Sequence, residues 1–277
     1  MAQTLSAEAG VWAPEKPWVG RSFSRAAGSY DGVAVLQRQV GEQLLARLGD
    51  ISPAPRAVLD VGAGTGYCTA RLAALFPDAD VVALDIAEGM LQTLQGRLGL
   101  PGRVLCLCGD GEALPLRAGS VDRVFSNLAL QWCCDLPAVL AEFRRVLRPG
   151  GVALFSIFGA GTLAELRTAW AMADGYAHVN AFLSEDTVAA ALAAAGCSAY
   201  ALSGERRVLR YADVRALLRE LKALGAHNVM RGRPRHLTGK TAFGRMLAAY
   251  PVCAADGGIA ASFAVIYGVA HFAEAGG

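Results

Sequence analysis

The sequence has little net charge, few histidines and no pair of cysteines at a metal-ligand spacing. Its 277 residues include 26 Lys and Arg against 24 Asp and Glu, which leaves a net charge of +2. A balance this even gives no overall attraction to nucleic acid, so any attraction to an acidic partner has to be local. The four histidines lack H-x-x-x-H spacing and the seven cysteines lack C-x-x-C spacing, which disfavours a metal site. We therefore assign no metal and expect reduced thiols.

A targeting segment and a membrane-spanning run are also lacking. Residues 1–20 hold neither a basic region nor a continuous apolar stretch, so we expect no signal peptide and a cytoplasmic protein. The most apolar window, residues 188–202, contains glycine and serine and follows Ser184, Glu185 and Asp186. These three residues are typical of a helix N-cap with acids in the first turn. We therefore expect a soluble helix in this window and no membrane association.

The middle of the chain alternates short apolar runs with helical patterns, which is typical of βαβ units and a parallel sheet. Hydrophobic residues make up 54% of the chain, enough for a large core. The runs are continuous rather than alternating, as expected of strands that helices cover on both faces. The predicted strands are residues 57–61, 81–85, 103–108, 121–126 and 152–158, and the predicted helices are residues 67–76, 88–98 and 136–147, the last stopped by Arg-Pro-Gly-Gly at residues 148–151.

After the fifth predicted strand the pattern changes to helix-rich segments, with one strand within residues 200–211 and another at residues 262–272. The sequence thus predicts an α/β fold with a doubly wound, mostly parallel sheet of seven strands. We expect a flexible tail over residues 1–20 and a single domain from residue 21 onward. Helical insertions are predicted near residues 160–195 and 212–258, over the carboxyl edge of the sheet, where open α/β sheets bind ligands.

A glycine-rich loop at the end of the first predicted strand is the strongest local signal. Glycine occupies every second position from Gly62 through Gly64 to Gly66, directly after Asp60 and Val61. Glycines can take positive φ and let a ligand approach the backbone closely. The spacing is G-x-G-x-G, so the pyrophosphate seat of a G-x-G-x-x-G loop is not specifically indicated. A tight strand-to-helix turn is the alternative, but it would explain one such glycine rather than three.

Polar residues follow the next strands as well. Asp85 ends the second predicted strand, where a carboxylate can accept hydrogen bonds from both hydroxyls of an adenosine ribose; alternatively it caps the next helix. Asp110 follows the third strand and could accept from an adenine amino group. Asn127 and Leu128 end the fourth strand. Four loops therefore converge at one edge of the predicted sheet.

This ordered set, from about residue 55 to residue 158, resembles the S-adenosylmethionine-dependent methyltransferases of the doubly wound class. The resemblance implies S-adenosylmethionine as the methyl donor. The residues it implies for binding that donor are Asp60, Gly62, Gly64, Gly66, Asp85, Asp110, Asn127 and Leu128.

Segments outside that core are similar to one branch of the class, the malonyl-[acyl-carrier protein] O-methyltransferases of biotin synthesis. The segments are residues 23–31 with Gln37, residues 126–133, residues 178–182 and residues 221–226. The resemblance implies methylation of the free carboxyl of a malonyl thioester on an acyl-carrier protein. The methyl ester masks the charge, so that fatty-acid enzymes can elongate the product toward pimeloyl.

A carboxylate acceptor needs orientation rather than a general base, because it is already ionised at neutral pH. The candidates for this task are Tyr30 and Trp132 as hydrogen-bond donors and Arg25 as a cationic holder, with His178 and Asn180 as weaker substrate residues. Each has an ordinary alternative. Tyr30 and Trp132 could be packing residues at the core edge, Arg25 could be solvated, and His178 could bond neighbouring backbone.

Two other classes of function stay open on these observations. One is a methyltransferase that acts on another small acid or a quinone precursor, and the other is an RNA-modifying or non-catalytic S-adenosylmethionine-binding module. Residues 200–250 hold eleven Lys and Arg against three acids, but aromatic side chains are not interleaved as base stacking requires. We expect no nucleic acid and propose that part of this stretch docks an acidic acyl-carrier protein, the alternative being an ordinary solvated face. The arginines of the stretch include Arg206, Arg207, Arg231, Arg233 and Arg235.

Overall fold

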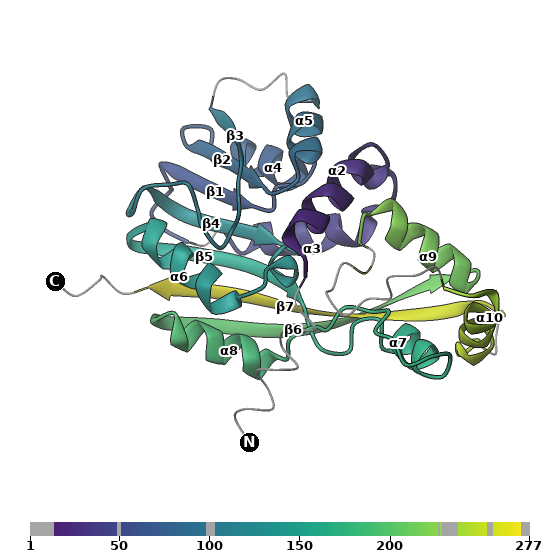
Figure 1. Cartoon of the computed structure of the whole chain (residues 1–277). Coiled ribbons are helices and arrows are strands. Elements are labelled where there is room, and N and C mark those ends of the chain that lie inside the picture. Colours follow the sequence, from purple (N-terminus) through teal and green to yellow (C-terminus); the bar gives the residue numbers. More distant parts are fainter. Residues whose placement is uncertain are drawn as a thin grey trace.

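The structure is a computed structural model that describes residues 14–48, 51–97, 103–226, 228, 238–253 and 257–272. Its strands are β1 (Ala57–Val61), β2 (Asp80–Asp85), β3 (Val104–Cys108), β4 (Val121–Asn127), β5 (Leu147–Phe158), β6 (Cys197–Tyr211) and β7 (Ile259–Phe272). They form one twisted sheet that crosses the molecule (Figure 1), in the order β3-β2-β1-β4-β5-β7-β6. The pairs from β3 to β5 are parallel, and β7 runs antiparallel to β5 and β6. The predicted doubly wound, mostly parallel sheet of seven strands is confirmed.

Helices cover both faces of the sheet, because neighbouring strand residues point to opposite sides. Val58 packs with Leu44 and Leu72 on one face, whereas Leu59 packs with Phe143 on the other. These buried apolar residues on both sides explain why the strands are continuous hydrophobic runs. The helices of the first face are α3 (Val35–Ala46), α4 (Tyr67–Leu75) and α5 (Glu88–Arg97), and those of the second face are α6 (Leu136–Val146) and α8 (Glu185–Ala194).

Side-chain caps start two of these helices, α6 and α8. Asp135 accepts a hydrogen bond from the backbone N–H of Ala138 at 3.0 Å and begins α6. Ser184 accepts from the N–H of Thr187 at 3.1 Å and begins α8. Each cap satisfies a backbone donor that the first turn leaves unpaired. The N-cap predicted at Ser184 is therefore confirmed.

Two predicted boundaries are wrong. The helix expected over residues 188–202 ends at Ala194, because Gly196 takes a left-handed φ of 74° and the chain then pairs with β7 from Cys197 onward. The fifth strand begins at Leu147 rather than at residue 152, with a register irregularity where it pairs with β4. Residues 148–151 therefore belong to β5, and pairing to neighbouring strands rather than local propensity sets both boundaries.

The tail expected over residues 1–20 is also corrected. The helix α2 (Lys16–Val33) begins at Lys16, and its residue Val19 is only 3% exposed. Burial of an apolar side chain and an ion pair of Lys16, described below, hold this first turn in place. Residues 1–13 lie outside the described residues.

The remaining helices lie at one end of the sheet. They are α7 (Ala164–Ala171), α9 (Val214–Ala223) and α10 (Lys240–Ala249), around the extended ends of β6 and β7 (Figure 1). The helix α9 also lies against α2, where Ser22 Oγ donates to the carbonyl of Gly225 at 2.8 Å. The segments after β5 and after β6 thus close over the carboxyl edge of the parallel strands. Within the described residues, no helix combines the length and the apolar character that a membrane crossing needs.

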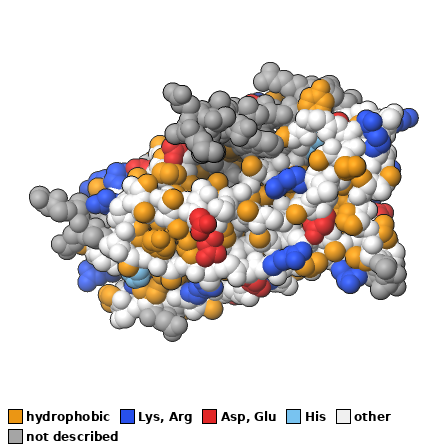
Figure 2. Space-filling model, turned by 90° about the horizontal axis from the view of Figure 1, so that it is seen from below, with side chains coloured by type: hydrophobic (Ala, Val, Ile, Leu, Met, Phe, Trp, Pro, Cys, Tyr) orange, Lys and Arg blue, Asp and Glu red, His pale blue; other side chains and the backbone are white. Residues whose placement is uncertain are grey.

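The edge strand β6 carries two of the arginines that the sequence analysis singled out. Arg206 donates to Ser262 Oγ at 2.8 Å, and Arg207 pairs with Glu205 at 3.1 Å. On the face viewed from the side of β6 and α8 (Figure 2), Lys and Arg side chains are interspersed with acidic and apolar ones. Of these two arginines, Arg207 is thus paired with a neighbouring carboxylate, whereas Arg206 keeps a side chain that is 71% exposed.

Candidate active site

The glycine-rich loop has the backbone that its sequence predicts. Gly62, Gly64 and Gly66 have φ values of 75°, 56° and 88°, a region that L side chains rarely adopt. A Cβ on Gly62 would lie 2.2 Å from the Cβ of Ala129, whereas one on Gly64 would meet no atom within 4 Å. Gly62 is therefore required by packing as well as by φ, and Gly64 opens onto free space.

Asp85 ties this loop to the next helix. Its Oδ2 accepts from the N–H of Gly64 and its Oδ1 from the N–H of Ala87, both at 2.8 Å. Burial raises the pKa of the carboxyl, although the backbone hydrogen bonds oppose the shift. Asp85 also lines a cavity at the carboxyl edge of the sheet. Both readings of this residue, ligand acceptor and helix cap, thus match its position.

The cavity beside Asp85, called here the first cavity, has an empty volume of about 750 Å³ with its mouth and the adjoining open space included. Among the predicted site residues, those in its wall are Tyr30, Gly62, Gly64, Asp85, Asp110, Asn127, Leu128 and Trp132. Gly66 does not line the first cavity; it is the N-cap residue of α4, and a side chain there would meet Leu94.

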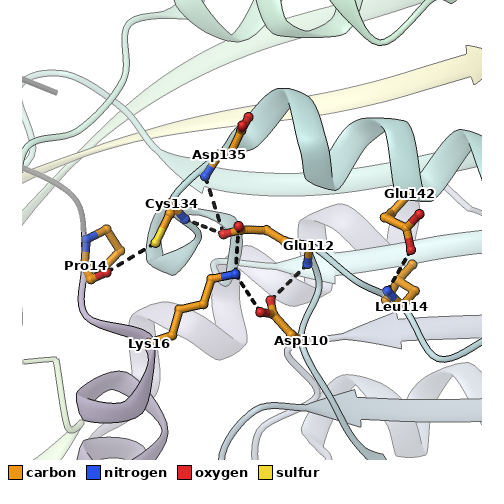
Figure 3. Close-up of polar contacts among 8 residues, drawn as sticks. All are labelled: Pro14, Lys16, Asp110, Glu112, Leu114, Cys134, Asp135 and Glu142. Carbon is orange, nitrogen blue, oxygen red and sulfur yellow. Dashed lines mark hydrogen bonds and ion pairs between the residues drawn. The ribbon is translucent and has the colours of Figure 1, made fainter. Parts of the chain in front are cut away.

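The wall opposite the sheet comes from α2, whose first turn, with Lys16 and Val19, sequence reasoning missed. Lys16, Val19 and Phe23 all line the first cavity. Lys16 Nζ donates to Asp110 Oδ2 at 2.6 Å and lies 2.7 Å from Glu112 Oε2 (Figure 3). Desolvation lowers the pKa of Lys16, but the hydrogen bonds and charges of the two carboxylates outweigh it and raise the pKa. Asp110, predicted to accept from adenine, therefore also anchors α2.

A second cavity lies beyond Trp132, which lines both cavities. Its wall is mostly apolar, and Phe158 packs against Phe182 at 6.0 Å between ring centroids. Two of the predicted substrate residues, His178 and Asn180, lie in this wall. The predicted substrate residues are thus brought next to the first cavity from a segment far along the chain.

A third cavity lies on the other side of the glycine-rich loop. It shares Tyr30, Gly62, Gly64 and Asn127 with the first cavity and Gln37 with the second. Asp60 and Arg38 also line it, and Arg38 is a charged residue that sequence reasoning did not select. Asp60 is 1% exposed and accepts from Thr69 Oγ1 at 2.7 Å, and burial raises its pKa to about 7. The three cavities meet around Tyr30, Gln37 and Trp132.

The remaining candidates differ in position. Tyr30 is partly buried at the meeting point, and the desolvation of its hydroxyl raises its pKa well above the ordinary value, so the hydroxyl stays protonated. Arg25 is exposed on α2 and lines none of the three cavities; the structure does not bring it to the site. His178 stacks on Trp170 at 3.7 Å between ring centroids and lies 2.9 Å from Asp174. These contacts hold the imidazole in the cavity wall.

No group of three or more His, Cys, Asp and Glu side chains among the described residues could hold a metal ion. Hydrogen-bond donors, buried carboxylates and backbone amides line the three neighbouring cavities.

Comparison with known proteins identifies the chain's relatives. Residues 59–155 match the family model described as a methyltransferase domain. The chain is 52% identical to the malonyl-[acyl-carrier protein] O-methyltransferase of Methylococcus capsulatus, over 86% of each chain. It is 47% identical to the enzyme of the same name from Laribacter hongkongensis, over 92% of this chain and 88% of that one.

Solved structures agree on the fold. The YcgJ protein of Bacillus subtilis superposes with a TM-score of 0.61 at 16% identity, covering 84% of this chain and 98% of that chain. The glycine-rich loop and the strand-end carboxylates agree with these matches. Because the relatives are 47–52% identical over most of their length, the chain belongs to the malonyl-[acyl-carrier protein] O-methyltransferase family.

Proposed function

We propose that this protein transfers the methyl group of S-adenosylmethionine to the free carboxylate of a malonyl thioester on an acyl-carrier protein, and so supplies a methyl ester to biotin synthesis. Family membership over most of the chain carries this proposal. The geometry supports it, because the first and third cavities lie on either side of the glycine-rich loop and both adjoin the apolar second cavity.

The residues of the first and third cavities fit the methyl donor. Gly64 presents open space to a ligand, and a buried carboxylate at Asp85 suits two ribose hydroxyls. The third cavity offers Asp60 and Arg38 to the charged amino-acid end. This assignment places the reacting end of the donor near Tyr30 and Trp132, where the cavities meet. When bound, the donor supplies an electrophilic methyl on a positively charged sulfonium.

The transfer itself needs alignment. A carboxylate oxygen attacks the methyl carbon as the carbon–sulfur bond breaks, and the opposite charges of acceptor and sulfonium disappear together. A water-poor, preorganised site favours such a step. Tyr30 holds its proton and Trp132 has only an N–H donor. In our proposal these two side chains orient the acceptor, and neither removes a proton.

The test is a transfer assay with labelled S-adenosylmethionine and malonyl-acyl-carrier protein, malonyl-coenzyme A, free malonate and a quinone precursor as acceptors. We expect the labelled methyl ester of the malonyl thioesters by mass spectrometry. Transfer to the quinone precursor alone would favour the alternative methyltransferase, and donor binding without any transfer would favour a non-catalytic module.

Docking of the carrier on the basic stretch stays a prediction. Arg231, Arg233 and Arg235 lie outside the described residues. Arg207 is paired with Glu205 and mostly covered, whereas the side chain of Arg206 is 71% exposed and stays available for the predicted role. The cytoplasmic location also stays a prediction.

A further inference from the structure

The second cavity contains a buried polar group without a partner. Asn180 is 8% exposed, and its Oδ1 has no hydrogen-bond partner within the described part of the chain. The same holds for Oε1 of Gln37, which lines the second cavity where it meets the third. Buried oxygens of this kind are uncommon, because an unmade hydrogen bond carries the full desolvation penalty. Both carboxamides line a cavity large enough for a ligand, and a ligand that pairs with them would remove that penalty.

The chemistry of the carboxamides restricts what this ligand is. A malonyl carboxylate only accepts hydrogen bonds, so it can pair with the nitrogen of a carboxamide but not with its oxygen. A secondary amide carries both a donor and an acceptor, and it matches a carboxamide in either orientation of the side chain. The apolar walls at Phe158, Phe182 and Leu221 suit the methylene segments between such amides. The cavity therefore fits a flexible chain of amides and methylenes.

We propose that the second cavity binds the pantetheine arm that carries the malonyl thioester, with the carboxamide of Asn180 paired to an amide of the arm. This inference rests on the proposed function and names a binding site for its acceptor. The thioester end lies at Trp132 and Gln37, which border the donor cavities. The outer end leaves past Lys222, which is exposed and also lines the cavity.

Lys222 suits the phosphate at the end of the arm. No ion pair of Lys222 occurs with any described residue, and the nearby Glu220 is engaged by the hydroxyl of Tyr211 at 2.8 Å. A lysine ammonium at a cavity mouth binds a phosphate as a point charge. Arg219, another basic residue exposed on the same helix, α9, does not line the cavity and serves as the control for Lys222.

The experiment compares Asn180→Leu with the parent enzyme on two acceptors, malonyl-pantetheine and the malonyl thioester of ethanethiol, which has no amide. We expect the KM for malonyl-pantetheine to rise about 3–10-fold, the effect of one lost neutral hydrogen bond, while the KM for the ethanethiol thioester and the Kd for S-adenosylmethionine stay unchanged. The Tm should not fall, because Oδ1 has no protein partner to lose. An equal KM change for both acceptors, no KM change, or a lowered Tm would overturn the proposal.

A second pair of variants tests the outer end. Lys222→Gln should raise the KM for malonyl-phosphopantetheine several-fold and leave that for malonyl-pantetheine unchanged, whereas Arg219→Gln should change neither. If both variants respond alike, or Lys222→Gln has no effect, the arm does not leave past Lys222. Failure of the proposed function is distinguishable, since the parent enzyme would then methylate neither of the two acceptors of the first comparison.

Discussion

At the scale of single residues, Asp85 has two roles, one in the backbone of the loop and one in the wall of the first cavity. It holds the N–H of Gly64 in the loop and the N–H of Ala87 before α5, while it lines the first cavity. A carboxylate oxygen has two lone pairs, so these backbone bonds leave acceptor capacity for a ribose hydroxyl. The same atoms can therefore shape the loop and bind the donor.

We predict that Asp85→Ala weakens binding of S-adenosylmethionine at least about tenfold, because each hydrogen bond to a charged acceptor contributes about 1.5–3 kcal/mol. Titration calorimetry on the folded variant measures this. Asp80→Ala is the control, since Asp80 is exposed at the other end of β2 and its loss should leave the affinity unchanged. Parental affinity in a folded Asp85→Ala protein would remove Asp85 from the donor site.

Tyr30 provides a prediction about pH. Because burial raises the pKa of its hydroxyl far above neutrality, the side chain stays a donor throughout the physiological range. Tyr30→Phe should then lower kcat without adding a new ionisation to the pH profile. Profiles of kcat for both proteins through neutrality check this, and a parental rate that depends on a deprotonation near pH 7 would contradict an orienting role.

Asp60 should make stability depend on pH. Burial raises its pKa from the ordinary value of about 3.9 for an aspartate to about 7 in the folded protein, so between these values the folded state binds a proton that the unfolded state has released. Stability from this group is therefore lost as pH rises toward 7 and is constant above, with a slope of up to about 1.4 kcal/mol per pH unit.

Asp60→Asn should abolish this component. Urea unfolding of both proteins at several pH values should show the free-energy difference between variant and parent growing from about pH 4 to about pH 7. A difference that does not vary with pH would show that Asp60 is ionised in the folded state at acidic pH. Asp80→Asn, at an exposed position, should give a flat difference.

At the scale of elements, α2 is the wall that covers the first cavity. Lys16 joins its first turn to the loop after β3 through Asp110 and Glu112, and Phe23 packs edge-on against Trp132 at 5.1 Å between centroids. The ion pair is partly exposed, with 27% of the Lys16 side chain accessible, so it contributes at most about 1 kcal/mol. This modest stability suits a cover that has to admit and release ligands.

We predict that Lys16→Met increases hydrogen exchange in the first turn of α2 and speeds dissociation of S-adenosylmethionine a few-fold. The two carboxylate contacts are then lost, while the burial of Val19 stays. Arg21→Gln is the matched control, because Arg21 donates to Pro17 O within the same helix. Unchanged exchange and dissociation in Lys16→Met would show that packing alone holds α2 closed.

At the scale of the whole molecule, the nearly balanced charge makes any steering of an acidic carrier depend on local basic groups. Such steering is screened beyond about 8 Å at physiological salt. We predict that added salt raises the apparent KM for malonyl-acyl-carrier protein more than that for malonyl-coenzyme A. Steady-state kinetics across a salt series tests this, and parallel salt responses would argue against electrostatic docking.

The sequence alone determined the parallel part of the sheet and the loop at its edge. The features that did so are the continuous apolar runs, the glycine spacing and the carboxylates at the strand ends. Buried parallel strands leave a direct pattern in the sequence, and the ends of such strands meet at one edge. The first five strands, the loop at Gly62 and the position of Asp85 in the first cavity therefore followed from local sequence. The family segments likewise pointed to Tyr30 and Trp132, which the structure places where the cavities meet.

Only the tertiary structure decided which distant segments complete the cavities. Lys16 and Asp110 are 94 residues apart, and no periodicity relates one to the other. The end of α8 depends on pairing of β6 with β7, which overrides the helical preference of an alanine-rich window. Likewise Arg25 matched a family segment but points away from the cavities, because a helix turns each side chain about 100° from the last. Contacts between segments far apart in the sequence decide these three features, and a local sequence pattern does not indicate such contacts.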